Sequence, residues 1–209
     1  MNRKQNWLSW LCAPAIAALE ICGLVAAYFH LGWEMFRYYT VDSNLLLLIS
    51  ALMWLIGEGR FLRDGVRIPT ALKVFKYMAT CTTTLTFMVV LTVLAPMEES
   101  YWYFFVSGEM LYLHTLCPLL ALVSFLLWES HDLRLIHTLM ALVPTLLYAV
   151  VAVVLNVLRI WEGPYAFLLV YVQPLWLSLV WAAVIPGGAW VLAALLRRCN
   201  LALHQEYVY

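Results

Sequence analysis

Six long apolar stretches alternate with short polar connections in this 209-residue chain, and this pattern constrains the fold more than any other feature. A helix needs about 20 mostly apolar residues to cross the roughly 30 Å hydrocarbon core of a bilayer. The chain is 65% hydrophobic and 11% charged, whereas a soluble domain is about half apolar and a quarter charged. We therefore expect an all-α integral membrane protein, a single domain over residues 1–209 with six transmembrane helices. The predicted spans cover residues 7–29, 40–57, 74–96, 108–128, 136–158 and 166–190.

The distribution of lysine and arginine predicts how the spans are oriented. Basic residues in short loops accumulate on the cytoplasmic side of a membrane protein. All of the 12 lysines and arginines except Arg37 and Arg159 fall on one side of the predicted spans, and Glu98 and Glu99 fall on the other. We therefore expect both termini to be cytoplasmic in a multi-pass protein of the cell membrane.

The sequence gives no sign of a cofactor, a structural metal or a nucleic acid. The basic residues form no dense patch with interleaved aromatic residues, so nucleic-acid binding is excluded. No GxGxxG or GxxxxGK loop is present to hold a nucleotide, and there is no GxSxG nucleophile motif. His131 and His137 are a weak metal signal, which a solvated loop explains more simply. We expect no cofactor and no metal.

Nearly all polar residues predicted to lie at membrane depth fall in the outer half of the bilayer, and the first group opens the second span. On a helix Thr40, Ser43 and Asn44 share one face, while Asp42 points about 200° away from Thr40. Intramembrane polar residues usually mark a functional site. An alternative is that Asp42 or Ser43 only caps the start of the helix.

His114 in the fourth span is harder to explain by helix capping. It lies six residues beyond Gly108, which corresponds to about 9 Å inside the apolar zone. Pro118 lacks an N–H group, so we expect it to leave the His114 carbonyl without its helical donor. Such groups require partners from neighbouring helices, water or a ligand. A purely structural hydrogen bond between helices is the alternative.

Further polar residues extend this predicted site. Glu109, Asn156 and Gln173 lie near the outer ends of the fourth, fifth and sixth spans, whereas Glu20 lies nearer the middle of the first. Glu20 could orient His114 or have a separate structural partner. The third span carries threonines whose hydroxyls we expect to bond to their own backbone. These are Thr80, Thr82, Thr83, Thr84, Thr86 and Thr92.

A hydroxyl and an imidazole in one cavity meet the minimum requirement for nucleophilic acyl transfer. Thr40 would be the nucleophile and His114 its general base, although Thr40 is expected to lie several ångströms shallower. A site inside the membrane would receive a lipid ester laterally. The residues expected to position either partner are Asp42, Asn44, Glu109, Asn156 and Gln173.

Three short motifs resemble a known family. The first motif is Thr40 followed by Ser43-Asn44, and the second is Leu113-His114-Thr115 followed by Pro118. The third is the segment 161–167 with Gly163-Pro164-Tyr165. All three are similar to motifs of the androgen-induced membrane hydrolases and their bacterial six-helix relatives. The animal members hydrolyse fatty acid esters of hydroxy fatty acids with a threonine and a histidine. The resemblance implies Thr40 and His114 as the catalytic pair, a membrane lipid or lipid-like ester as substrate, and, through its bacterial members, a bacterial plasma membrane.

Two other functions remain open from the sequence. Glu20, Asp42, Glu109 and His114 could form a path for protons or small solutes, as intramembrane ionisable residues do in transporters. Most of these residues are predicted to lie in the same leaflet, and the third span offers only hydroxyls on the inner side. This argues against a proton or solute path that crosses the whole membrane. A non-catalytic membrane partner protein is the other alternative.

The end of the last apolar stretch is ambiguous. Pro186-Gly187-Gly188 is expected to break it, because proline and glycine are poor helix formers. Residues 186–203 then either continue as a kinked helix or lie along the inner interface.

Overall fold

The computed structural model describes residues 3–129 and 132–204, and within these ranges it contains helices and no strands. Six helical segments in the described ranges are long and apolar enough to cross a membrane. This confirms the predicted all-α six-helix bundle, and the chain is a multi-pass membrane protein. The spans are Trp7–Arg37, Tyr39–Asp64, Thr70–Met97, Gly108–Leu127, Ile136–Val157 and Leu175–His204.

Several spans are built from more than one helical element. The first three comprise α1 (Arg3–Leu31), the 3-10 helix η1 (Gly32–Arg37), α2 (Tyr39–Asp64), α3 (Thr70–Val89), the π-helix η2 (Val90–Leu94) and α4 (Ala95–Met97). Next come the short α5 (Tyr101–Val106), α6 (Gly108–Met110), the π-helix η3 (Leu111–Leu116) and α7 (Cys117–Leu127). The remaining elements are α8 (Ile136–Met140), α9 (Val143–Val157), the 3-10 helix η4 (Ala166–Leu168) and α10 (Leu175–His204).

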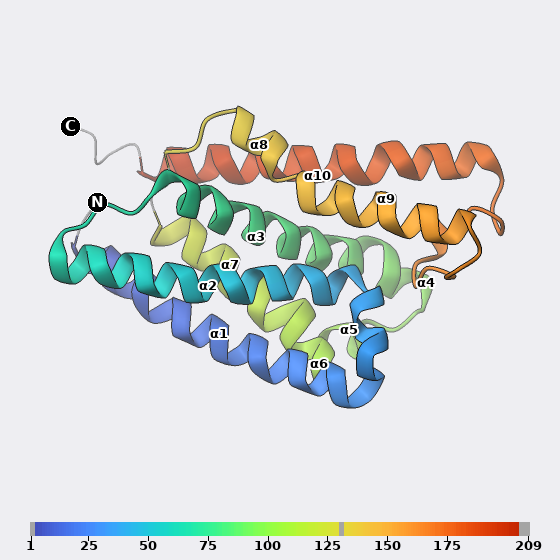
Figure 1. Ribbon diagram of the computed structural model, residues 1–209, viewed down its shortest axis with the longest axis horizontal. Helices are drawn as coiled ribbons and strands as arrows, with labels where there is room; N and C mark the ends of the chain where they lie inside the picture. Colours follow the sequence, from blue (N-terminus) through green and yellow to red (C-terminus); the bar gives the residue numbers. More distant parts are fainter. Residues whose placement is uncertain (1–2, 130–131, 205–209) are drawn as a thin grey trace.

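Helices α1, α2, α3 and α7 form the centre of the bundle, while α9 and α10 lie along one side of it (Figure 1). Small side chains let the central helices approach closely, as is usual in membranes. Ala17, Ala51, Ala79 and Ala121 are all buried in one cluster at this centre. The helix α10 packs against α3, α7 and α8 and borders the bundle along its upper edge in the view.

The first and last described helical ends lie at the same end of the bundle (Figure 1). We call this the inner end, following the orientation that the basic residues predict. The opposite, outer end carries η1, α4, α5 and α6, which cap the bundle before the chain re-enters it (Figure 1).

The sixth span differs from its predicted bounds. It starts at Leu175 rather than at residue 166, and it runs without interruption through Pro186 to His204. Residues 186–203 therefore continue the helix, and the expected break does not occur. Proline and glycine are tolerated in transmembrane helices because a helix is the only way to satisfy most backbone groups in lipid. Residues 158–174 form a loop that contains η4.

Candidate functional site

Thr40 and His114 are brought together at the outer end of the bundle. Thr40 Oγ1 lies 3.2 Å from His114 Nε2, and the two residues are only 7% and 3% exposed. The expected difference in depth is therefore absent. The reason is that the start of α2 is not at the surface, because η1 precedes it and the loop carrying Tyr165 covers it.

The second ring nitrogen of His114 determines which nitrogen carries the proton. His114 Nδ1 lies 2.9 Å from the backbone carbonyl oxygen of Phe104. A carbonyl can only accept a hydrogen bond, so Nδ1 carries the proton and Nε2 is left with a lone pair directed at the Thr40 hydroxyl. Thr115 adds a parallel bond, donating from Oγ1 to the Phe105 carbonyl at 2.8 Å. Both carbonyls belong to the last turn of α5, where helical carbonyls lack partners within the helix.

The π-helix η3 changes which carbonyl is left free near the site. The N–H of Cys117 donates to the Tyr112 carbonyl, five residues back. In the same pattern the Leu113 carbonyl would receive the N–H of residue 118, but this residue is Pro118 and has none. The prediction that the His114 carbonyl is left free is therefore shifted by one residue, because the sequence does not reveal the π-turn.

Asn44 supplies the missing donor and joins α2 to η3. Its Nδ2 donates to the Leu113 carbonyl at 3.0 Å and to the Thr40 carbonyl at 2.7 Å. Ser43 donates to the same Thr40 carbonyl at 2.9 Å and lies 3.0 Å from the Thr86 hydroxyl of α3. The predicted shared face of Thr40, Ser43 and Asn44 is thus buried between α3 and η3, where it fixes the backbone of Thr40.

Tyr165 is a site residue that the sequence interpretation did not select. Its hydroxyl lies beside the Thr40 hydroxyl and the backbone N–H groups of Tyr39 and Thr40. Burial raises the pKa of Tyr165 to about 12, although these neighbouring donors lower it, so the phenol keeps its proton at neutral pH. The ring stacks on Phe167 with centroids 5.2 Å apart. The Gly163-Pro164-Tyr165 turn was the sequence feature that could have pointed to Tyr165. The sequence does not show that this turn lies next to Thr40, because that contact depends on the tertiary structure.

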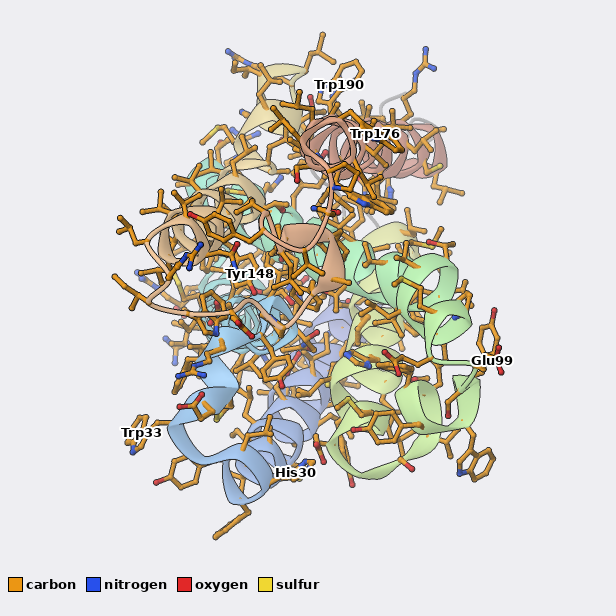
Figure 2. The ribbon with its side chains drawn as sticks, turned by 90° about the vertical axis from the view of Figure 1, so that its right-hand side faces the viewer. His30, Trp33, Glu99, Tyr148, Trp176 and Trp190 are labelled. Atoms are coloured by element: carbon orange, nitrogen blue, oxygen red, sulfur yellow. The ribbon has the colours of Figure 1, made fainter. Side chains whose placement is uncertain are left out.

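A cavity of about 350 Å³ at the outer end contains this group of residues. Thr40, His114 and Tyr165 line it together with His30 and Glu109, and most of the remaining wall is apolar. Figure 2 looks onto this end, with His30 at the periphery and Tyr148 nearer the middle of the bundle. The volume falls in the range of small-molecule sites, about 300 to 1,000 Å³.

Asp42 does not join Thr40 and His114. It lines a separate cavity of about 600 Å³ together with Arg37, Tyr148 and Trp161. This follows from its predicted direction on the helix, and the expectation that Asp42 positions the pair is not met. Nor does Asp42 or Ser43 cap α2. The capping residue is Tyr38, which makes no side-chain capping bond.

Glu109 lies at the rim of the site rather than beside Thr40 Oγ1 and His114 Nε2. Its Oε1 is 2.6 Å from His30 Nδ1, and the His30 side chain is more than half exposed. This pair links α1 to α6 at the outer end. Glu109 therefore closes one side of the cavity without contacting Thr40.

Asn156 and Gln173 support the loop that carries Tyr165. The N–H of Val170 donates to Asn156 Oδ1 at 3.0 Å, and Gln173 Nε2 donates to the Phe167 carbonyl at 3.0 Å. Gln173 lies in this loop rather than within the sixth span, because α10 starts two residues later. The two residues thus act on the site only through the loop.

Glu20 is fully buried in the centre of the bundle and does not orient His114. The His114 nitrogen that it would have to contact is bonded to Phe104. Within the described ranges, neither carboxyl oxygen of Glu20 has a hydrogen-bond partner that meets the usual geometric criteria, and the thiol of Cys117 lies close to it.

A second polar group lies in the inner half, where the third span was expected to offer only hydroxyls. Glu58, Lys76 and Glu129 are completely buried there, with Ser9 and Ser124 bonded to the two carboxylates. The expectation that nearly all polar groups at membrane depth lie in the outer half is therefore wrong. Sequence alone placed these charged residues in or next to inner loops, because their distance from a helix end does not reveal burial. The threonines of α3 do bond to their own backbone carbonyls, as expected.

The described ranges contain no group of three or more His, Cys, Asp and Glu residues that could hold a metal ion. The weak metal signal from His131 and His137, which a solvated loop explained more simply, cannot be followed, because His131 lies outside the described residues.

Comparisons of the chain with protein-family models, with curated proteins and with solved structures gave no match.

Proposed function

We propose that this protein hydrolyses a lipid ester within the outer leaflet, with Thr40 as nucleophile and His114 as general base. The 3.2 Å contact between Thr40 Oγ1 and an unprotonated His114 Nε2 carries the proposal. A general base must lie about 2.6 to 3.2 Å from the heavy atom whose proton it removes. The proposal agrees with the resemblance to the androgen-induced membrane hydrolases.

The reaction would proceed in two halves. Nε2 of His114 takes the Thr40 hydroxyl proton while Oγ1 bonds to the ester carbonyl carbon. The ester C–O bond then breaks, and the leaving alcohol takes the proton from Nε2, which leaves an acyl group on Thr40. Next, a water molecule gives a proton to Nε2 and attacks this acyl group. The bond to Oγ1 breaks, Thr40 regains its proton and the carboxylic acid leaves.

Tyr165 and the start of α2 supply donors for the negative charge that forms on the carbonyl oxygen. The Tyr165 hydroxyl lies beside the attacking Thr40 hydroxyl, and the backbone N–H groups of Tyr39 and Thr40 lie beside that phenol. The first N–H groups of a helix have no partner within it. Preformed donors of this kind are the usual means of stabilising an oxyanion.

The surroundings of the pair suit an apolar ester. Tyr165 borders both the site cavity and an apolar groove of about 500 Å³ between α9 and α10. Valine, leucine and alanine side chains line most of this groove. We infer that the acyl chain enters from the bilayer through this groove, which suits a membrane lipid or lipid-like ester as substrate. We also infer that the protein works in a cell membrane, and its resemblance to the bacterial relatives suggests the bacterial plasma membrane.

A fluorophosphonate probe tests the proposal in the purified protein. The threonine oxygen should displace fluoride and become phosphonylated. Labelling should disappear in Thr40→Ala, weaken strongly in His114→Ala, and persist in Thr92→Ala, a threonine on the exposed side of η2. Labelling that survives Thr40→Ala would refute the nucleophile. Proton or solute flux in proteoliposomes without any labelling would instead favour transport.

A further inference from the structure

The cavity of about 600 Å³ between α2 and α9 is not used by the proposed hydrolase. Asp42 and Leu46 of α2 line one side of it, Leu147 and Val151 of α9 line the other, and Arg37 at the end of η1 also borders it. Leu46 lies seven residues beyond the start of α2, which corresponds to about 10 Å further into the bundle. The cavity therefore combines charged groups near the outer end with apolar walls at greater depth.

Asp42 brings a carboxylate without a partner to this cavity. The residue is partly buried, and within the described ranges its side chain makes no hydrogen bond and no ion pair. Its oxygens are not enclosed by protein atoms, so they face the open space of the cavity. The dipole of α2 favours an acidic residue in the first turn but gives it no hydrogen-bond donor. Because an unpaired carboxylate at membrane depth is costly, Asp42 indicates a ligand with N–H donors and positive charge.

Aromatic rings beside Asp42 suit the same kind of ligand. Tyr39, Tyr148 and Trp161 all line the cavity, and Tyr148 lies at the outer end of the molecule (Figure 2). The rings of Tyr39 and Tyr148 have centroids 5.2 Å apart. The Tyr39 hydroxyl is bonded to Thr145, and the Tyr148 hydroxyl donates to the Arg37 carbonyl, each at 2.7 Å, so both rings are held in place. Aromatic faces attract cations, and rings next to a carboxylate therefore favour an ammonium group.

Arg37 adds a positive charge to the outer part of the same cavity. Its Nη1 pairs with Glu34 of the same short helix, and its side chain is about half exposed. A guanidinium group has five N–H donors, so several remain for a ligand after this pair has formed. Arginine binds phosphate through two parallel N–H groups. A ligand that joins an ammonium group, a phosphate and an apolar chain is a zwitterionic phospholipid.

We propose that the cavity between α2 and α9 binds a phospholipid whose head carries a primary ammonium group, as in phosphatidylethanolamine. The ammonium group donates to Asp42, the phosphate accepts from Arg37, and an acyl chain lies along Leu46 and Leu147. A primary ammonium group has the N–H donors that the Asp42 oxygens lack, whereas a quaternary one has none. The cavity does not include Thr40, so this lipid is a bound component of the protein and is not the ester that it hydrolyses.

Native mass spectrometry of the detergent-purified full-length protein tests the site. Phosphatidylethanolamine, phosphatidylcholine and phosphatidylglycerol with identical acyl chains are titrated separately. Phosphatidylethanolamine should bind on the order of tenfold more tightly than the other two, as expected for a hydrogen bond to a charged group. Phosphatidylcholine lacks the N–H donors, and phosphatidylglycerol lacks the ammonium group. Equal binding of the three lipids, or a preference for either of the other two, would overturn the proposal.

Variants of the two charged residues show which part of the head each one binds. Asp42→Asn should lower the affinity for phosphatidylethanolamine to that for phosphatidylcholine, whereas Arg37→Gln should weaken binding of all three lipids because each has a phosphate. The matched control is Arg63→Gln with Asp64→Asn, an exposed pair at the inner end of α2, which should change none of the affinities. An unchanged preference for phosphatidylethanolamine in Asp42→Asn would refute the proposal. The wild-type lipid series decides should a variant fail to fold.

The hydrolase proposal and the lipid site can fail separately. Thr40→Ala should bind phosphatidylethanolamine as the wild-type protein does, because Thr40 lies in the other cavity. Loss of the lipid preference in this variant would contradict a separate site.

Discussion

Asn44 offers the sharpest test of how the site is held in place. Its Nδ2 donates to the carbonyls of Thr40 and Leu113, so it joins the nucleophile's own backbone to the helix that carries His114. Asn44→Leu keeps nearly the same volume and removes both bonds. Two buried carbonyls then lose a donor, and nothing fixes Thr40 relative to η3 at this point.

The expected loss of stability can be worked out from these two bonds. Hydrogen bonds between transmembrane helices contribute about 0.6 kcal/mol on average and up to about 1.7 kcal/mol. Only the bond to the Leu113 carbonyl crosses between helices, while the bond to the Thr40 carbonyl lies within α2 and contributes about 0.5 to 1.5 kcal/mol as an ordinary intramolecular hydrogen bond. Together they give about 1.1 kcal/mol, with an upper bound near 3.2 kcal/mol. The unfolding equilibrium should therefore shift by about sixfold or more. The rate of fluorophosphonate labelling should fall further than this, because a displacement of about 1 Å at a catalytic group can cost on the order of a hundredfold.

The chain provides a matched control at its inner end. Asn200 is also fully buried, and its Nδ2 also donates to two carbonyls, those of Phe125 and Glu129, at 2.6 and 2.8 Å. Asn200→Leu should lower the free energy of unfolding by a similar amount in denaturing detergent but leave the labelling rate of Thr40 unchanged. The reasoning fails if Asn44→Leu labels at the wild-type rate, or if both variants lose labelling equally.

Three further substitutions probe the surroundings of the site. Tyr165→Phe keeps the ring stacking and removes one oxyanion donor, so kcat/KM for ester hydrolysis should fall by about 10²- to 10³-fold with little change in thermal unfolding. An unchanged rate would exclude Tyr165 from the reaction. Pro118→Ala restores an N–H group, so the π-turn should be replaced by regular α-helical hydrogen bonds. The free energy of unfolding should rise by up to about 1 kcal/mol, and the rate of fluorophosphonate labelling should fall. Faster labelling would contradict the role of the π-turn. Glu109→Gln breaks a partly exposed rim pair with His30, so the free energy of unfolding should change by less than about 1 kcal/mol; loss of labelling would show that Glu109 acts directly.

The fold was predictable from sequence because span length and hydropathy depend on the bilayer, which is the same for every helix. The last span was misplaced for a specific reason. Residues 166–174 are as apolar as a helix, yet they form a loop packed against the outer end. Conversely, Pro186 suggests a break that the membrane does not allow.

The candidate site was predictable only in part. Helical periodicity correctly separated Thr40 from Asp42, and the depth of His114 marked it as a residue in need of a partner. Tyr165 depends on a loop that folds back over α2, and burial of Lys76 depends on packing by several other helices. Neither the contact of Tyr165 with Thr40 nor the burial of Lys76 can be predicted from the spacing of residues along the sequence.

Identification of the residue that carries the acyl group tests the central claim most directly. The protein is mixed with a long-chain p-nitrophenyl ester, quenched in acid within the first turnover, and digested for mass spectrometry. We expect the acyl group on Thr40 in the wild-type protein and none in Thr40→Ala. An acyl group on Ser43, or ester consumption that persists in Thr40→Ala, would contradict catalysis by the Thr40 and His114 pair.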